Sequence, residues 1–122
     1  MTDPEAIVRA WCDAISDRDK ARFLELSHAA IAFYSTDGVG TGHDVVADWF
    51  DTEPMRITIT SIEVDGLTVR LHQHIDWLDA QGNVADAADS AAQIEVHDDK
   101  VFSYRRIDEA EGPTGDKPVI SP

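Results

Sequence analysis

Two kinds of hydrophobic pattern divide this chain near residue 55. Before that point apolar residues recur at helical spacing, and after it they mostly alternate with polar residues as in β-strands. Helices are predicted over about 4–16, 19–27 and 42–52, with one brief strand between the second and third at 31–34. Strands are predicted over 57–64, 68–78, 87–96 and 101–107. Because short turns separate these strands, they should form an antiparallel meander.

Local signals support this division. Asp3 followed by Pro4 is a typical helix start, and Asp19 can cap the second helix. The segment 35–42 contains three alternate glycines, but it lacks the G-x-G-x-x-G spacing of a dinucleotide site and is predicted to be a turn-rich loop. Helices in the N-terminal half and a meander in the C-terminal half predict an α+β fold, in which one curved sheet wraps around the helices.

The strand predicted over 68–78 carries the most distinctive polar residues. Its alternation places four apolar side chains on one face, namely Val69, Leu71, Ile75 and Trp77. The opposite face carries Arg70, His72, His74 and Asp76. We expect this polar face to line a pocket, because imidazole and carboxylate groups two residues apart can contact one small molecule. A merely solvated face is the alternative.

Further pocket residues are predicted from the last strand and from the helices. Strand parity puts Phe102, Tyr104 and Arg106 on one face, which we expect to turn toward His72, His74 and Asp76. The full predicted lining adds Trp11, Tyr34 and Trp49. Asp76 would act as general base and His74 as proton carrier. Alternatively, Asp76 and Arg106 form a buried ion pair that only stabilises the sheet.

A metal site is a further alternative on the same strand. His72 and His74 have the His-x-His spacing that presents two imidazoles on one face, and Asp76 could be a third ligand. The sequence places no fourth ligand, so the prediction is that no metal and no cofactor is bound.

Length and charge limit the classes of function. A chain of 122 residues forms one domain, expected over residues 1–108, with a loose tail at 109–122 that contains three prolines. The formal net charge of −14 disfavours binding to nucleic acid and to anionic membranes. There is no apolar run long enough to span a bilayer and no secretory signal pattern, and the single cysteine, Cys12, fits a reducing compartment, so a cytoplasmic location is expected.

The order of these features resembles the nuclear-transport-factor-2-like superfamily and its SnoaL-like members. The features are the helix with Trp11, the Asp-Arg-Asp break at 17–19, Tyr34, the segment Gly-His-Asp-Val-Val at 42–46 and the meander. The resemblance covers nearly the whole chain and implies a cone-shaped sheet enclosing one pocket. Members include isomerases, hydrolases, cyclases, dehydratases and binding modules, so the resemblance is specific for fold and not for function.

Within the superfamily, the limonene-epoxide-hydrolase-like branch is the most similar. Its Arg-x-Asp strand resembles His74-Ile75-Asp76, which keeps the aspartate and replaces the arginine. The branch also implies a catalytic role for Tyr34, whereas Arg106 stands where a proton-donating aspartate is expected. Ketosteroid isomerases use a carboxylate near the end of the first strand, and no such base is evident at Tyr34-Ser35.

These observations predict a cofactor-independent enzyme that acts on a small, mostly apolar metabolite by acid–base chemistry of the epoxide-hydrolase, isomerase or cyclase type. The alternative is a binding module for a small molecule or a protein partner, with the same fold and no catalysis. If His74 and Asp76 face the pocket, Val69, Leu71, Ile75 and Trp77 must face outward, where a second copy of the chain would cover them. A sheet-to-sheet homodimer is therefore expected.

Overall fold

The computed structural model describes residues 3–35 and 38–107, so the predicted tail lies outside the described residues. Its helices are α1 (Pro4–Ser16), α2 (Lys20–Glu25) and α3 (His43–Thr52). Its strands are β1 (Ser27–Ser35), β2 (Gly38–Thr41), β3 (Met55–Asp65), β4 (Thr68–Leu78), β5 (Val84–His97) and β6 (Lys100–Ile107). The α+β class is confirmed.

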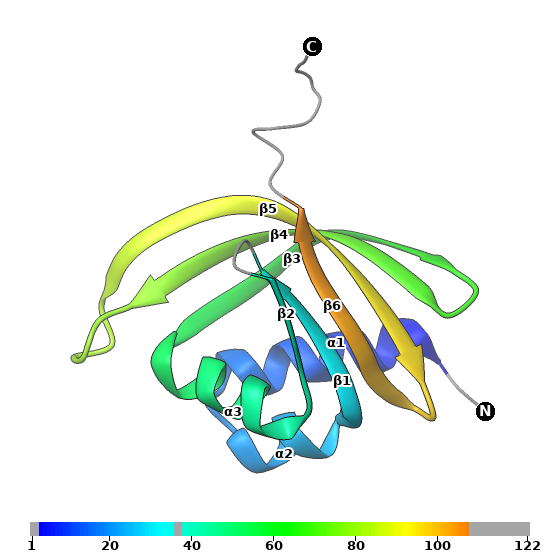
Figure 1. The fold of residues 1–122 in the computed structure, drawn as a ribbon. Helices are drawn as coiled ribbons and strands as arrows, with labels where there is room; N and C mark the ends of the chain where they lie inside the picture. The colour runs from blue at the N-terminus through cyan, green and yellow to red at the C-terminus, as the bar shows by residue number, and fades with distance from the viewer. Residues whose placement is uncertain (1–2, 36–37, 108–122) are drawn as a thin grey trace.

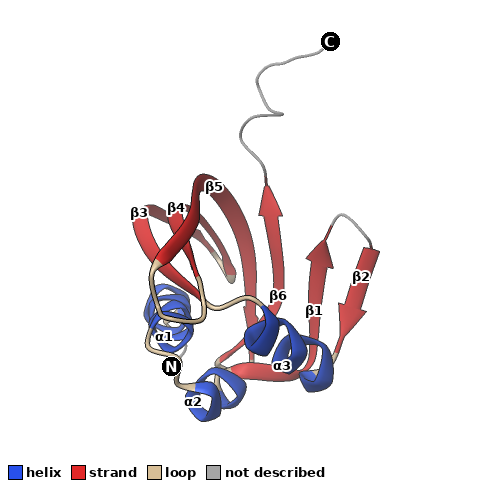
Figure 2. Cartoon of the chain, turned by 90° about the vertical axis from the view of Figure 1, so that its left-hand side faces the viewer, coloured by secondary structure: helices blue, strands red, loops and turns tan. Residues whose placement is uncertain are grey.

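One strongly curved sheet forms the body of the molecule, and the three helices lie in its concave side (Figures 1 and 2). The six strands follow the order β2-β1-β6-β5-β4-β3. Strands β3 to β6 are the predicted antiparallel meander, while β1 pairs with β6 in parallel and with β2 in antiparallel orientation. The parallel pairing brings the N-terminal strand beside the last one, which the local sequence pattern does not indicate.

Most of the predicted elements are confirmed. Helix α1 begins and ends where expected, with the Asp3 carboxylate accepting a hydrogen bond from the Ala6 amide at 3.3 Å, and strand β4 also has its predicted bounds. The segment predicted as a loop contains the short edge strand β2, so that expectation is wrong for residues 38–41. Gly40 in this strand lies so close to α3 that an added Cβ would be 2.7 Å from Val45, which explains one of the glycines by close packing.

The prediction of which face of β4 looks inward is wrong. Val69, Leu71 and Ile75 are buried against the helices on the concave side, and Trp77 packs against the same core. His74 is 40% exposed and lies on the convex side, as parity requires. Burying each of these apolar side chains contributes about 1.5–3 kcal/mol, so the apolar face is the one that turns toward the helices.

The argument for a homodimer changes with this reversal. The convex face of β4 carries Arg70, His72, His74 and Asp76 rather than an apolar patch. Pairing two sheets through this face would bring polar side chains together, so the patch that motivated the homodimer is absent from this strand. The homodimer itself stays a prediction.

A bulge in β6 changes the parity of the last strand. Val96 pairs with Val101 and Glu95 pairs with Ser103, so Phe102 is an extra residue between the two pairs. Val101 and Tyr104 are consequently both buried in the core. Phe102 contacts the rings of His28 and His97 at 5.0 and 4.7 Å and does not line the pocket described below, so its predicted place in the pocket is wrong.

An aromatic cluster fills the space between the helices and the sheet. Trp11 is fully buried there, and its indole Nε1 donates a 2.9 Å hydrogen bond to Ser27 Oγ. Its ring lies 5.3 Å from Phe23 and 5.4 Å from Tyr104. Trp11 is therefore a core residue that packs against Tyr104, and its predicted place in the lining of the pocket is wrong.

Cys12 is buried in the same core, and burial raises the pKa of its thiol to about 12. We expect the native protein to react with Ellman's reagent far more slowly than the same protein in guanidinium chloride, because the thiolate is the reacting species. Spectrophotometric thiol counting in both conditions measures this directly. A native thiol that reacts as fast as the unfolded one would show that α1 does not stay packed on the sheet.

In the described part of the chain, no helix has both the length and the apolar character needed to cross a membrane.

Candidate functional site: an apolar pocket with a charged rim

A cavity of about 580 Å³ lies between α3, the edge of the sheet formed by β1 and β2, and the inner faces of β4 and β6. Its walls are mainly apolar and aromatic. The side chains that form them belong to Phe33, Val39, Val45, Trp49, Met55, Ile75 and Tyr104. The volume suits a small metabolite, and such walls favour a ligand with an apolar body.

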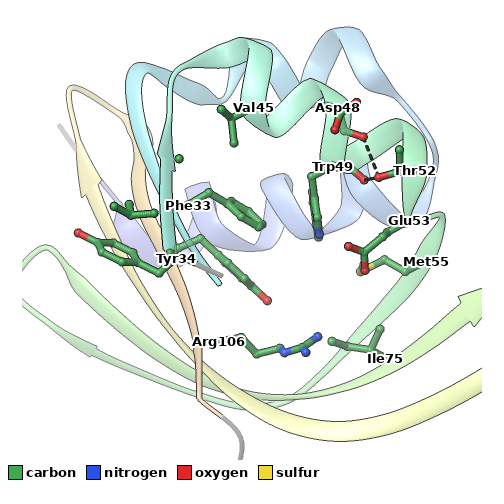
Figure 3. A pocket seen from close by; sticks show the side chains of 14 residues that line it. Phe33, Tyr34, Val45, Asp48, Trp49, Thr52, Glu53, Met55, Ile75 and Arg106 are labelled. Atoms are coloured by element: carbon green, nitrogen blue, oxygen red, sulfur yellow. Dashed lines mark hydrogen bonds between the residues drawn. The ribbon is translucent and has the colours of Figure 1, made fainter. Parts of the chain in front are cut away.

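Charged groups surround this apolar space. Asp48, Glu53 and Arg106 all line the pocket, and all three are exposed residues. Figure 3 shows the Glu53 side chain beside Met55 and the Arg106 guanidinium beside Ile75, while Asp48 lies further along α3 next to Thr52. A ligand in the pocket would therefore meet a carboxylate from the end of α3 and a cation from β6.

Glu53 owes its position to the way α3 ends. The helix ends at Thr52, and the Glu53 amide donates a 3.0 Å hydrogen bond to the Trp49 carbonyl. Pro54 follows and cannot continue the helix, so the chain turns directly into β3. The Glu53 side chain thereby lies near Trp49 on the helix and Met55 on the strand (Figure 3).

Tyr104 supplies the buried polar group of the pocket. Its ring stacks on Phe33 with centroids 5.0 Å apart, and its hydroxyl oxygen accepts a 3.1 Å hydrogen bond from Gln73 Nε2. Burial raises the pKa of Tyr104 to about 12, and the charge of Glu53 adds to the rise, while the Gln73 hydrogen bond and the charge of Arg106 oppose it. The phenol therefore stays protonated at neutral pH and can donate a hydrogen bond.

Four of the predicted pocket residues lie in the pocket, namely Tyr34, Trp49, Tyr104 and Arg106. Tyr34 is at the rim, because consecutive residues of β1 point to opposite sides and its neighbour Phe33 is the buried one. The Arg105 guanidinium lies over the Tyr34 ring at 4.5 Å. The Arg106 guanidinium lies 5.7 Å from the Trp77 ring, on the concave side of the sheet.

His72, His74 and Asp76 lie on the other face of the sheet, so their predicted place in the pocket is wrong. Asp76 and Arg106 are on opposite faces, and the carboxylate of Asp76 bonds to His74 Nε2 at 2.9 Å. The ion pair between Asp76 and Arg106, the alternative interpretation of the sequence, is therefore not formed. The pocket therefore lacks the β4 aspartate that the limonene-epoxide-hydrolase-like branch implies.

His74 bridges two strands on the convex face. Its Nδ1 lies 2.8 Å from Asp89 Oδ1 on β5, and its Nε2 bonds to Asp76. Both ring nitrogens can donate only in the imidazolium form, so the geometry favours protonated His74. The hydrogen bonds that His74 donates to the carboxylates of Asp89 and Asp76 raise the pKa of His74 above its usual 6.5.

This arrangement predicts that the protein loses stability as pH rises. Since the pKa of His74 is raised on folding, its contribution is complete below pH 6.5 and is lost as pH rises through the folded-state pKa. We expect the free energy of unfolding to fall from pH 6 toward pH 8, with a smaller fall in Asp89→Asn. Urea unfolding between pH 6 and pH 8 measures the free energy of unfolding, and NMR titration of the His74 ring measures its pKa. A His74 pKa at or below 6.5 would contradict the prediction.

The same contacts bear on the metal-site alternative. Both nitrogens of His74 face carboxylate oxygens, so neither presents a lone pair to an ion. Over residues 3–35 and 38–107, no group of three histidine, cysteine or acidic side chains is placed to hold a metal.

The sequence analysis missed several residues of the pocket. Glu53 and Asp48 were passed over because a helix end rich in acids is usually a solvated surface. Gln73, which does not line the pocket but hydrogen-bonds to Tyr104, was also missed, although it gave a detectable signal as the one polar residue on the apolar face of β4. Such a residue on a core-facing strand must find hydrogen-bond partners and often marks a polar network.

No family model and no curated protein matches this sequence. Solved structures are similar in fold at low identity. The Δ5-3-ketosteroid isomerase from Mycobacterium sp. matches with a TM-score of 0.77 and 16% identity over 91% of this chain and 96% of that chain. An NTF2-like protein of unknown function from Cytophaga hutchinsonii matches with a TM-score of 0.75 and 10% identity, over 87% and 89% of the two chains.

A candidate polyketide cyclase from Xanthomonas campestris pv. campestris matches with a TM-score of 0.71 and 15% identity, over 84% of this chain and 87% of that chain. Identities this low establish the architecture and leave the chemistry open. The chain therefore has the cone-shaped fold found in nuclear-transport-factor-2-like proteins, ketosteroid isomerases and polyketide cyclases.

Proposed function

We propose that the protein is a cofactor-independent enzyme that transfers a proton at the carbon next to a carbonyl group of a small, mostly apolar molecule. The observation that carries this proposal is the composition of the pocket, in which Glu53, Tyr104 and Arg106 surround an apolar space. Enolate formation needs a base to take the proton, and a neutral hydrogen-bond donor and a cation both stabilise the charge that develops on the carbonyl oxygen.

Each group has one role in this reaction. The Glu53 carboxylate takes the proton, the C–H bond breaks, and the electron pair moves onto the carbonyl oxygen as an enolate. Tyr104 donates a hydrogen bond to that oxygen, and the Arg106 guanidinium stabilises the negative charge. If the carbonyl is next to a carbon–carbon double bond, the protonated Glu53 then returns the proton to a different carbon of the conjugated enolate, which gives an isomer. Otherwise the enolate carbon attacks a second carbonyl of the same molecule, which closes a ring, and the new alkoxide takes the proton back from Glu53.

The apolar walls support the same chemistry. Phe33, Trp49 and Ile75 surround the inner part of the pocket beside the buried Tyr104, so the Tyr104 dipole acts on an enolate there with less screening than in water. Arg106 is exposed at the rim, so its charge is screened more. Isomerases and cyclases among the proteins of similar fold are consistent with this reaction class.

Hydrogen–deuterium exchange tests the proposal without knowledge of the natural substrate. 2-Acetylnaphthalene has an apolar body and exchangeable protons beside its carbonyl, and mass spectrometry follows its deuterium content in D₂O. We expect the protein to accelerate exchange above the buffer rate at the same pD. Binding of the ketone without any acceleration would instead identify a non-catalytic binding module, and the enzymatic proposal would fail.

A further inference from the structure

Gln73 is a buried amide on the core-facing side of β4, between Leu71 and Ile75, and it is 2% exposed. Its Nε2 donates to two oxygens, Tyr104 Oη at 3.1 Å and Ser90 Oγ at 3.2 Å. Its Oε1 is the one buried side-chain nitrogen or oxygen atom, among those of the described residues, that has no hydrogen-bond partner. Burying an amide in this way costs free energy, so its retention in the core calls for a reason beyond packing.

The hydrogens of this network decide what Tyr104 can offer to the pocket. A phenol has one hydrogen to donate, and Tyr104 Oη already accepts from Gln73. Its own hydrogen therefore points away from Gln73 and is available to the pocket that Tyr104 lines. A rotated Gln73 amide would reverse the situation, because Oε1 would then accept the Tyr104 hydrogen.

The two amide orientations differ in what they leave unpaired. The observed orientation leaves one carbonyl oxygen without a partner, whereas the rotated one would leave an NH₂ group with two buried donors unpaired. Unpaired buried N–H groups are rarer in proteins than under-satisfied carbonyl oxygens. The observed orientation is therefore the more stable of the two.

We propose that Gln73 is a positioning residue that holds Tyr104 as a hydrogen-bond donor, so that the pocket selects ligands whose inner end carries an acceptor oxygen, such as a ketone. This inference rests on the proposed function, because the same hydroxyl would receive the developing enolate. It goes further by assigning the polarity of the inner subsite to a residue that does not line the pocket.

A pair of ligands of the same shape measures this polarity. 2-Acetylnaphthalene and 2-isopropenylnaphthalene differ only in a carbonyl oxygen against a CH₂ group, and equilibrium dialysis gives the affinity of each. The ratio of the two affinities is compared between variants, so the hydration of the free ligands cancels. We expect the native protein to prefer the ketone, because Tyr104 donates a hydrogen bond to the carbonyl oxygen and cannot donate one to the CH₂ group.

In Gln73→Glu, measured at a pH above the pKa of the introduced carboxyl, the ionised side chain can only accept, so Tyr104 donates to it and loses its donor role in the pocket. We expect the preference for the ketone to fall by roughly 5- to 10-fold, the value of one hydrogen bond. Ser90→Ala is the matched control, because it leaves the bond between Gln73 and Tyr104 in place and should keep the native ratio.

Gln73→Met decides the question if the charged variant does not fold. The methionine keeps the length of the side chain and removes the hydrogen bond that Gln73 donates to Tyr104. Because a hydroxyl that accepts one hydrogen bond donates another more strongly, we expect the preference for the ketone to fall two- to threefold. The Tyr104 pKa should rise, since the lost hydrogen bond lowers it. The pKa is read from the ultraviolet absorbance of fluorotyrosine in a Tyr34→Phe background, where Tyr104 is the only tyrosine left.

An unchanged affinity ratio and an unchanged Tyr104 pKa in the folded Gln73 variants would overturn the inference. The result is separable from that of the proposed function, because binding preference requires no turnover. Native protein that fails to exchange deuterium but prefers the ketone in a Gln73-dependent way would refute the enzyme and leave the positioning role standing.

Discussion

Replacing Glu53 by glutamine is expected to lower the rate of deuterium exchange into 2-acetylnaphthalene by about 10²- to 10⁴-fold, the usual contribution of a positioned general base. The amide keeps the size of the side chain but cannot accept the proton. Because Glu53 is exposed at the end of α3, the substitution should leave the fold intact. Mass spectrometry of the ketone gives the rate, and circular dichroism checks the fold.

Asp44→Asn is the matched control for this measurement. It removes the same charge, but Asp44 lies in the first turn of α3, at the opposite end from Glu53, and does not line the pocket. Exchange in Asp44→Asn should equal that of the native protein. Deuterium exchange at the native rate in Glu53→Gln would show that Glu53 is not the base, whatever the control shows.

Truncating Leu71 to alanine is expected to lower the free energy of unfolding by about 2–5 kcal/mol, because it opens a cavity in the core. Leu71 is 1% exposed and faces the helices. Its neighbour Arg70 is exposed on the convex face, and Arg70→Ala should change the free energy of unfolding by no more than about 0.5 kcal/mol. Urea unfolding of both variants measures the difference.

The pair also tests the orientation of β4. A larger loss of stability in Arg70→Ala than in Leu71→Ala would mean that the strand faces the helices with its polar side, and it would return His74 and Asp76 to the pocket. The comparison is sharp because the two residues are adjacent in one strand and differ only in the face they occupy.

Strand β4 shows what can be learned from alternation alone. The pattern correctly predicts the bounds of the strand and which residues share a face. Assigning the inner face requires a physical criterion, and the applicable one is burial of Val69, Leu71 and Ile75 against the helices. The polar side chains of His74 and Asp76 suggested a site, but their own hydrogen bonds with Asp89 and with each other hold them on the convex surface.

By itself the sequence determined the α+β class, the bounds of α1 and β4, and the meander, because caps, proline and hydrophobic period act over a few residues. Only the tertiary structure decided which residues form the pocket. The parallel pairing of β1 with β6, the bulge at Phe102 and the turn from α3 into β3 bring Glu53, Tyr104 and Arg106 together. These contacts join residues far apart in the chain, and local patterns carry no information about such distances.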